Sequence, residues 1–293
     1  MVHKFTIIFI IQEVMGMKLY TPIRKLGITL GLFMVVASQQ ASAITINLDF
    51  SLGGLSASQQ TIFGQAELFW EGVLTGYQPS VSPAIEATGI TISAQGTAID
   101  GVGGTLGSAG PQTIWNSGGF VLTSTGLMNF DTADLDNMES GGTLQAVILH
   151  EMAHVLGFGT LWSETYNNVY TTGSGQYTGA AGLAAYNAEF GQSGSFIPVE
   201  LGGGAGTAGA HWNEVDGGGG LTGITDGSGN DMRDELMTGW LNANTFVSNP
   251  TRQSFVDIGY TVAAVPVPAA VWLFISGFGL LYGFANKKQR TAC

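Results

Sequence analysis

Cysteine and basic residues are nearly absent from this chain. The single cysteine is the C-terminal Cys293, so no disulfide can form within the chain and no thiolate is available as a metal ligand before its last residue. Arg233 and Arg252 are the only basic residues in 26–286, whereas all but one of the 21 acidic residues lie there. This balance excludes nucleic acid as a partner, because binding to phosphates requires Lys and Arg. An acidic surface instead suits an exported protein and can attract divalent cations.

The N-terminal part of the sequence has the order of features that is typical of an export signal. A charged segment, an apolar run and a small-residue cleavage site follow one another, at 18–25, 26–36 and Ala41-Ser42-Ala43. This order predicts an export signal region at 1–43 and a mature chain that begins near Ile44. An uncleaved membrane anchor is the alternative interpretation.

A second apolar run, 269–285, lies near the C-terminus between Val265-Pro266-Val267-Pro268 and a basic tail. This arrangement resembles the PEP-CTERM sorting signal of Gram-negative bacteria, with Val-Pro-Val-Pro in place of Pro-Glu-Pro. The resemblance implies that 263–293 is a sorting signal with one membrane helix, and that an exosortase is a partner besides the export machinery. It also implies a location at the cell envelope or surface, or release from the cell. A permanent anchor with its basic tail in the cytoplasm is the alternative.

Glycine, with 45 residues, is concentrated in two segments, 101–119 and 202–229. We interpret both segments as long loops. Residues 100–119 and 202–220 could be disordered or could order over a substrate. Apolar spacing and capping residues predict the regular elements outside them. The expected helices are 58–75 with Ser58 as N-cap and Gly76 as stop, 143–157, and one from Asn249-Pro250 to Gly259; the expected strands are 89–94 and 120–130. Together these elements predict an α+β fold in one domain, 44–262.

The segment His150-Glu151-Met152-Ala153-His154 lies in the second expected helix. Residues four apart share one face of a helix, so His150 and His154 can bind one zinc ion. Glu151 is rotated away from that face, where it can hold a water molecule and take its proton. The motif therefore predicts a catalytic zinc site with Glu151 as general base.

A catalytic zinc ion needs a third protein ligand and keeps its fourth position for water. The chain has four histidines, and His3 lies in the predicted export region. His211 is then the only other imidazole that can complete the site. Glu164 and Glu189 are the competing candidates, because a glutamate also serves as the third ligand in some zinc peptidases.

Gly157 follows His154 at the spacing of the metzincin peptidases, but Thr160 stands where their compact form has a third histidine. Together with His211-Trp212, the segment 234–237 (Asp-Glu-Leu-Met) and the segment 252–260, these residues resemble leishmanolysin, in which an insertion separates the glycine from the last histidine. The resemblance covers 129–260. It implies a twisted sheet, an active-site helix, a Met-turn in which Met237 lies beneath the metal, a C-terminal helix, and endopeptidase activity. Unlike the cysteine-rich leishmanolysins of eukaryotic parasites, this domain lacks cysteine.

Several alternatives remain open at the level of sequence. The chain could be a non-catalytic zinc-containing surface or matrix binding protein, or a zinc hydrolase of non-peptide amides. Trp162, Trp212 and Tyr260 could pack in the core or contact substrate. Calcium could bind two acidic clusters, although solvated loop charges are the simpler interpretation. The clusters are Asp131, Asp134 and Asp136, and Asp226, Asn230, Asp231 and Asp234.

Overall fold

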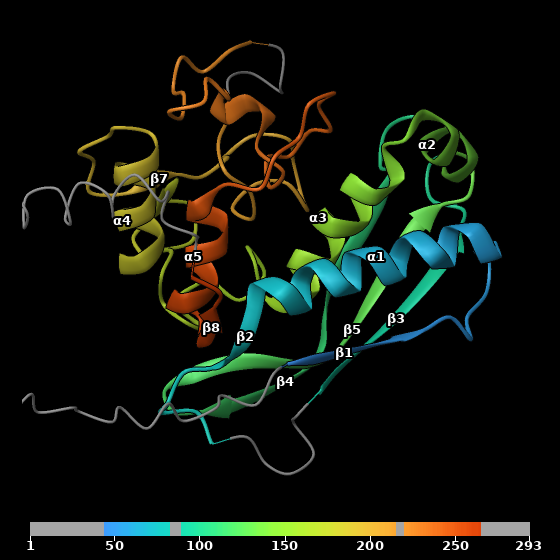
Figure 1. Ribbon diagram of the computed structural model, residues 1–293, viewed down its shortest axis with the longest axis horizontal. Coiled ribbons are helices and arrows are strands. Elements are labelled where there is room, and N and C mark those ends of the chain that lie inside the picture. Colours follow the sequence, from blue (N-terminus) through green and yellow to red (C-terminus); the bar gives the residue numbers. More distant parts are fainter. Residues whose placement is uncertain (1–43, 83–88, 215–219, 265–293) are drawn as a thin grey trace, which may run out of the picture. The chain divides into compact units, whose positions relative to one another are not determined.

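Residues 44–82, 89–214 and 220–264 are described in a computed structural model of the chain, and they form an α+β fold (Figure 1). The predicted export signal, and the proline motif, apolar run and basic tail after residue 264, lie outside the described residues. Within the described ranges, no helix is both long enough and apolar enough to cross a membrane.

A twisted four-stranded sheet with the strand order β1-β3-β5-β4 forms one layer of the fold. Its three parallel strands are β1 (Thr45–Asp49), β3 (Gly89–Thr97) and β5 (Phe120–Asp131), and β4 (Gly107–Ser117) runs antiparallel to β5 at the edge. Ile90, Ile92 and Ala94 of β3 are fully buried, because alternate side chains of a strand point to the same face. This apolar face packs against helices.

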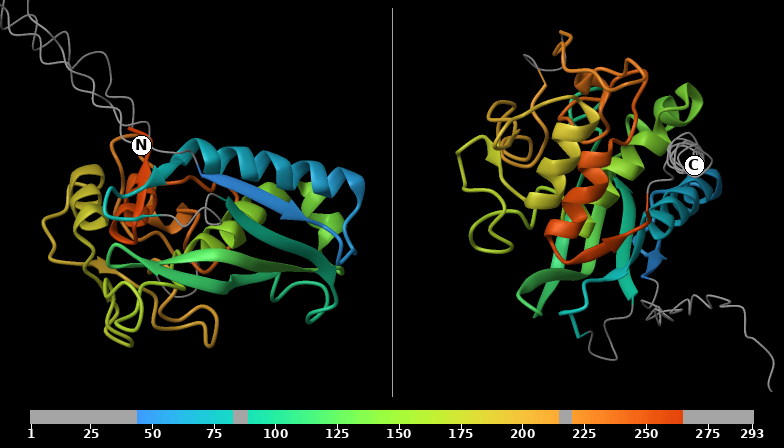
Figure 2. Two further views of the ribbon diagram at one scale, coloured as in Figure 1. Left: turned by 90° about the horizontal axis from the view of Figure 1, so that it is seen from below. Right: turned by 60° about the vertical axis from the view of Figure 1, so that its left-hand side comes forward.

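Helices α1 (Ala57–Val73) and α3 (Leu144–Leu156) pack against each other and against the sheet (Figure 2). The N-cap of α1 is Ser56, not the predicted Ser58. Ser56 forms a reciprocal capping box with Gln59, in which each side chain bonds the backbone N–H of the other residue, and this arrangement satisfies two free helix donors at once. The helix also ends before the predicted Gly76, because the chain continues as β2 (Leu74–Tyr77).

The predicted loop 101–119 is wrong for most of its length, since β4 occupies 107–117. The strand pairs with β5 through its backbone, and Gly118 and Gly119, with φ of +61° and +90°, form the turn between the two. All residues of β4 are half-buried or exposed, and its sequence has no alternation of apolar residues that would reveal a strand. The other predicted loop is confirmed: the described part of 202–229 contains no helix or strand.

The C-terminal half consists of short elements around α5 (Asn249–Asp257). Ser248 caps α5 and Pro250 lies in its first turn, so the predicted start is confirmed. Helix α4 (Ala180–Glu189) was not predicted; it has no side-chain N-cap of its own, and Asp257 of α5 accepts hydrogen bonds from its first N–H groups instead. The remaining elements are α2 (Leu135–Gly141), β6 (Gln176–Tyr177), α4 (Ala180–Glu189), β7 (Ile197–Pro198), the 3-10 helix η1 (Met232–Asp234) and β8 (Tyr260–Val262).

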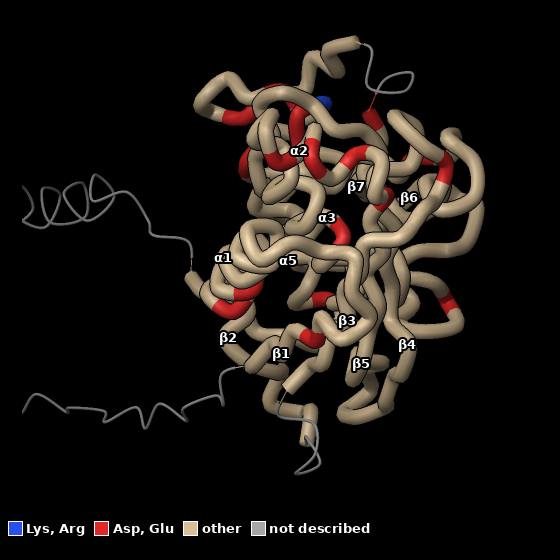
Figure 3. Tube along the Cα trace, turned by 90° about the vertical axis from the view of Figure 1, so that its right-hand side faces the viewer, with Lys and Arg blue, Asp and Glu red and all other residues tan. Residues whose placement is uncertain are grey.

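Acidic residues are distributed over many elements, whereas basic ones are nearly absent (Figure 3). In the described part of the chain, the one ion pair joins Arg233 and Asp234, with 3.1 Å between Nε and Oδ1. The described part of the fold is therefore held by apolar packing and hydrogen bonds rather than by ion pairs.

Candidate metal centre

Helix α3, which contains His150, Glu151 and His154, lies close against the sheet. A Cβ added at Gly126 of β5 would lie 2.2 Å from the side chain of Val155, so the glycine permits the close approach. Thr123 Oγ1, also on β5, donates a 2.7 Å hydrogen bond to the carbonyl of Val155. Gly157 then ends the helix as predicted, with a φ of +115° that favours glycine.

The chain beyond α3 turns back against the segment that carries the third histidine. Gly159 has a φ of +70°, and a Cβ there would lie 2.2 Å from the carbonyl oxygen of Ala210. On the other side of this segment, the N–H of Trp212 donates a 3.0 Å hydrogen bond to the carbonyl of Met237. His211 is thus held between two backbone segments, opposite α3.

The three predicted histidine ligands come together in the structure. Each pair of Nε2 atoms among His150, His154 and His211 is separated by 3.0 Å. In the ranges that the structure describes, these residues are the only group of three or more His, Cys, Asp or Glu side chains close enough to hold a metal ion. The histidines therefore form a candidate metal site.

The second ring nitrogen of each histidine is held by a backbone carbonyl. A carbonyl can only accept a hydrogen bond, so each Nδ1 carries a proton and each Nε2 of a neutral ring presents a lone pair. Three converging lone pairs at this separation repel one another unless a cation lies among them. The donor set fits a metal ion, and three neutral nitrogens without a thiolate suit zinc. The Nδ1–carbonyl pairs are His150 with Leu236 (2.8 Å), His154 with Phe158 (2.9 Å) and His211 with Thr207 (2.9 Å).

Burial keeps the three imidazoles neutral. Burial, and secondly the charge of His211, lowers the pKa of His150 to about 3. Burial and the charges of the other two histidines hold the pKa of His154 well below its ordinary value, and burial lowers the pKa of His211. At neutral pH all three rings are therefore ready to bind a cation without first losing a proton.

Glu151 lies beside the histidines with one carboxylate oxygen unpaired. Its side chain is buried, and Oε2 has no hydrogen-bond partner among the described residues. Burial raises the pKa of Glu151 to about 8. Gly107 of β4 makes room for it, because a Cβ there would lie 3.0 Å from Glu151 Cγ. An unpaired buried carboxyl destabilises the fold, and in a cavity such a group is typical of a functional site.

A cavity of about 900 Å³ opens onto the three histidines and Glu151. Its walls are residues 104–109, which lead into β4 and form its first three positions, residues of the glycine-rich segment 203–211, and residues of the turn 236–241. Thr160 also lines the cavity, and its Oγ1 donates a 2.7 Å hydrogen bond to the His154 carbonyl. Thr160, which stands where the compact metzincin pattern has a histidine, thus stabilises the end of α3.

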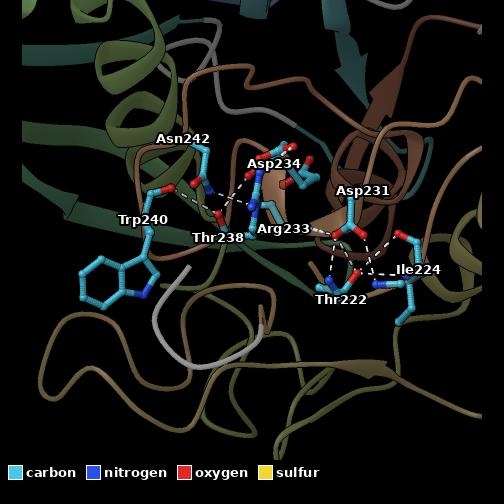
Figure 4. Close-up of polar contacts among 10 residues, drawn as sticks. Thr222, Ile224, Asp231, Arg233, Asp234, Thr238, Trp240 and Asn242 are labelled. Atoms are coloured by element: carbon cyan, nitrogen blue, oxygen red, sulfur yellow. Dashed lines mark hydrogen bonds and ion pairs between the residues drawn. The ribbon is translucent and has the colours of Figure 1, made fainter. Parts of the chain in front are cut away.

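Hydrogen bonds within 222–242 hold the segment that contains the predicted Met-turn (Figure 4). Asp231 accepts hydrogen bonds from the N–H groups of Thr222 and Arg233, both at 2.9 Å. The carbonyl of Arg233 in turn accepts a 2.7 Å hydrogen bond from the side chain of Asn242. Met237 is fully buried within the same turn. These hydrogen bonds thus hold the turn on both sides of Leu236, whose carbonyl accepts the hydrogen bond from His150.

The competing candidates for the third ligand lie elsewhere. Glu164 is exposed and accepts hydrogen bonds of 3.0 Å from the N–H and Oγ1 of Thr172. Glu189 accepts a 2.7 Å hydrogen bond from the N–H of Asn249. Neither glutamate lines the cavity, so the structure groups His211, not a carboxylate, with the two histidines of α3.

The aromatic residues that could have contacted substrate belong to the core. Trp162, Trp212 and Tyr260 are fully buried, and none of them lines the cavity. Trp162 and Trp212 pack against each other with ring centroids 4.8 Å apart, and both contact Phe158 and Tyr177. This cluster lies directly behind the segment that bears His211 and gives it a rigid support.

The two acidic clusters hold loops in place. Asp131 accepts hydrogen bonds of 2.8 Å from the N–H groups of Asp100 and Gly101. Asp226 likewise accepts 2.8 Å hydrogen bonds from the N–H groups of Ser228 and Asn230. In the described residues, neither cluster brings three carboxylates close enough to share an ion.

Several residues that build the site carry no signal in the sequence. The carbonyls that orient the histidines are backbone groups, which any residue supplies. Gly107 and Gly159 are two among the 45 glycines of the chain. Only the fold shows that a side chain at 107 would crowd Glu151, and that one at 159 would collide with the backbone of Ala210.

No protein-family model matches the sequence, and no curated protein matches it. The structure itself defines the class of site: a group of three histidines, two buried and one half-buried, close enough to bind a metal ion, beside a glutamate with one carboxyl oxygen unpaired among the described residues.

Proposed function

We propose that the chain is an exported zinc-dependent endopeptidase of the metzincin type, similar to the leishmanolysins. The observation that carries the proposal is the placement of Glu151, with a free carboxylate oxygen, beside three neutral imidazoles in one cavity. Met237 would be the Met-turn methionine and α5 the C-terminal helix of that fold. The sequence features of 1–43 and 263–293 support export and sorting, with an exosortase as a partner.

His150, His154 and His211 would hold the zinc ion through Nε2. A zinc ion with three imidazole ligands supplies a nucleophile at neutral pH, because it lowers the pKa of a water molecule to about 7, and it polarises a carbonyl group. Glu151 would orient the water, accept its proton through the free oxygen, and deliver that proton to the leaving amine. Burial raises the pKa of Glu151 to about 8, and a nearby cation would lower it. The carboxyl can therefore both accept and release a proton near neutral pH.

The walls of the cavity favour a polypeptide over a small amide. Among the described residues, strand β4 lies at the edge of the sheet and pairs with β5 alone. Residues 104–109, which lead into β4 and form its first three positions, line the cavity. An unpaired strand edge offers N–H and C=O groups with which an extended peptide can pair. This edge and the cavity of about 900 Å³ can receive several residues of an unfolded chain.

A non-catalytic zinc-containing surface protein is the second candidate, and the acidic, glycine-rich composition favours it. The buried, unpaired oxygen of Glu151 argues against it, because a binding protein gains nothing from a carboxyl that destabilises its fold.

The test is to measure zinc content and cleavage of a denatured protein substrate on the same purified sample. We expect about one zinc per chain and cleavage that a chelator abolishes. The matched control is Glu151→Gln, which should keep its zinc but lose nearly all activity, because an amide cannot accept the proton.

The other outcomes separate the candidates. Zinc without cleavage would favour the binding protein. A preparation that binds no zinc would overturn the metal site, and full activity of Glu151→Gln would remove that residue from its role as base.

A further inference from the structure

Glu235 is a fully buried carboxyl group without a basic partner among the described residues. Its side chain is 0% exposed, and in the described part of the chain the one ion pair involves Arg233 and Asp234 instead. Glu235 lies in the turn whose neighbouring residues Asp234 and Thr238 are drawn in Figure 4. A charge in such a place needs several hydrogen-bond donors, and the donors reveal its role.

One oxygen of Glu235 acts on His150 through a single peptide group. Oε2 accepts a 2.5 Å hydrogen bond from the N–H of Met237. The carbonyl of that same peptide group belongs to Leu236, and it accepts the 2.8 Å hydrogen bond from Nδ1 of His150. Burial raises the pKa of Glu235, and the hydrogen bonds from Thr251, Ser248 and Met237 oppose that rise; in its ionised form the carboxyl polarises the peptide group and strengthens its carbonyl as an acceptor. A stronger acceptor at Nδ1 fixes the ring and makes Nε2 a better donor to a metal.

The other oxygen reaches the segment of the third histidine. Oε1 accepts a 2.6 Å hydrogen bond from Oγ1 of Thr251, which in turn accepts a 2.8 Å hydrogen bond from the indole N–H of Trp212. Trp212 follows His211 directly, and its backbone N–H donates to the Met237 carbonyl. Oε1 also accepts hydrogen bonds from the N–H and Oγ of Ser248, the N-cap of α5.

We propose that Glu235 is a positioning residue for His150 and His211. Two ligands that are far apart in the sequence are held by one carboxylate, which acts through a peptide group on the first and through Thr251 and Trp212 on the second. This inference rests on the proposed metal site, because it concerns the orientation and donor strength of its ligands.

The experiment compares Glu235→Gln with Asp257→Asn in the purified full chain. Asp257 is the control. It accepts hydrogen bonds from two backbone N–H groups, as Glu235 does, and from one hydroxyl where Glu235 accepts from two; its donors are Ala181, Gly182 and Tyr177, and it holds α4 rather than the metal site. For each variant we would measure the zinc dissociation constant, by competition with a chelator of known affinity. The unfolding temperature of the metal-free protein and the visible spectrum of the cobalt(II)-loaded protein would be measured on the same samples.

We expect both variants to lower the unfolding temperature of the metal-free protein. Only Glu235→Gln should weaken zinc binding, by about 10-fold or more as for other residues that orient metal ligands, and only it should change the cobalt spectrum. Equal loss of stability in the two variants, with wild-type zinc affinity and an unchanged cobalt spectrum in Glu235→Gln, would overturn the inference.

If Glu235→Gln does not fold, Thr251→Val decides the question. This variant breaks the link to Trp212 and keeps the link to His150, so it should weaken zinc binding less than 10-fold but measurably; unchanged affinity would count against the inference. A wild-type protein that binds no zinc would instead overturn the proposed function itself.

Discussion

Replacement of Gly159 by alanine should damage the metal site from outside the cavity. Gly159 has a φ of +70°, which destabilises an alanine there by about 1–2 kcal/mol. The added Cβ would also lie 2.2 Å from the carbonyl oxygen of Ala210, well inside the 3.4 Å at which ordinary contact begins. The atoms that this Cβ would contact belong to the backbone and cannot rotate away, so the segment that carries His211 must shift. Strain of this kind adds about 1–3 kcal/mol.

Gly173→Ala is the matched control, because Gly173 has a similar φ of +78° and a Cβ there would meet nothing within 4 Å. Denaturant unfolding of the metal-free proteins should show a loss of about 1–2 kcal/mol for the control and a larger loss for Gly159→Ala. Zinc affinity should fall about 10-fold or more only in Gly159→Ala. Cleavage should fall about 100-fold, as expected when a catalytic group moves by about 1 Å. If the two variants behaved alike in stability and zinc affinity, the contact with Ala210 would not position His211.

Two further predictions concern the ligand set and a buried acid. His211→Ala should abolish binding of stoichiometric zinc, measured by metal analysis after gel filtration. Glu164→Gln and Glu189→Gln should keep their zinc. Zinc retained by the histidine variant would refute the ligand assignment. Burial, and secondly the charge of Glu200, raises the pKa of Glu214 to about 7. Between about pH 4.5 and 7 the folded state therefore binds more protons at this group than the unfolded state does. The contribution of Glu214 to the free energy of unfolding thus falls as pH rises through that window. Glu214→Gln should therefore gain stability relative to the wild type as pH rises from 5 to 8 in urea unfolding, and a pH-independent difference would show that this carboxyl is ionised throughout.

Predictions from the sequence succeeded where the signal is local. The helix 143–157 and its stop at Gly157 were predicted well, because apolar spacing and a C-terminal glycine act within a few residues. Strand β4 was missed, because an edge strand whose residues are all half-buried or exposed depends on backbone pairing with β5 rather than on its own pattern. The N-cap of α1 was misplaced by two residues, since Ser56 and Ser58 are both good caps and only the partner Gln59 selects between them.

The sequence by itself determined the chemistry of the site: His150, Glu151 and His154 at helical spacing, and His211 as the one further imidazole in the predicted domain. Only the tertiary structure decided whether these residues meet. His211 is 57 and 61 residues from the two histidines of α3, and no local rule specifies a contact over such a distance. The packing of α3 on β5, the approach of Gly159 to Ala210 and the carbonyl groups that orient each ring result from the whole fold. Residue type can be read from a sequence, whereas the orientation of a ligand depends on backbone groups that every sequence contains.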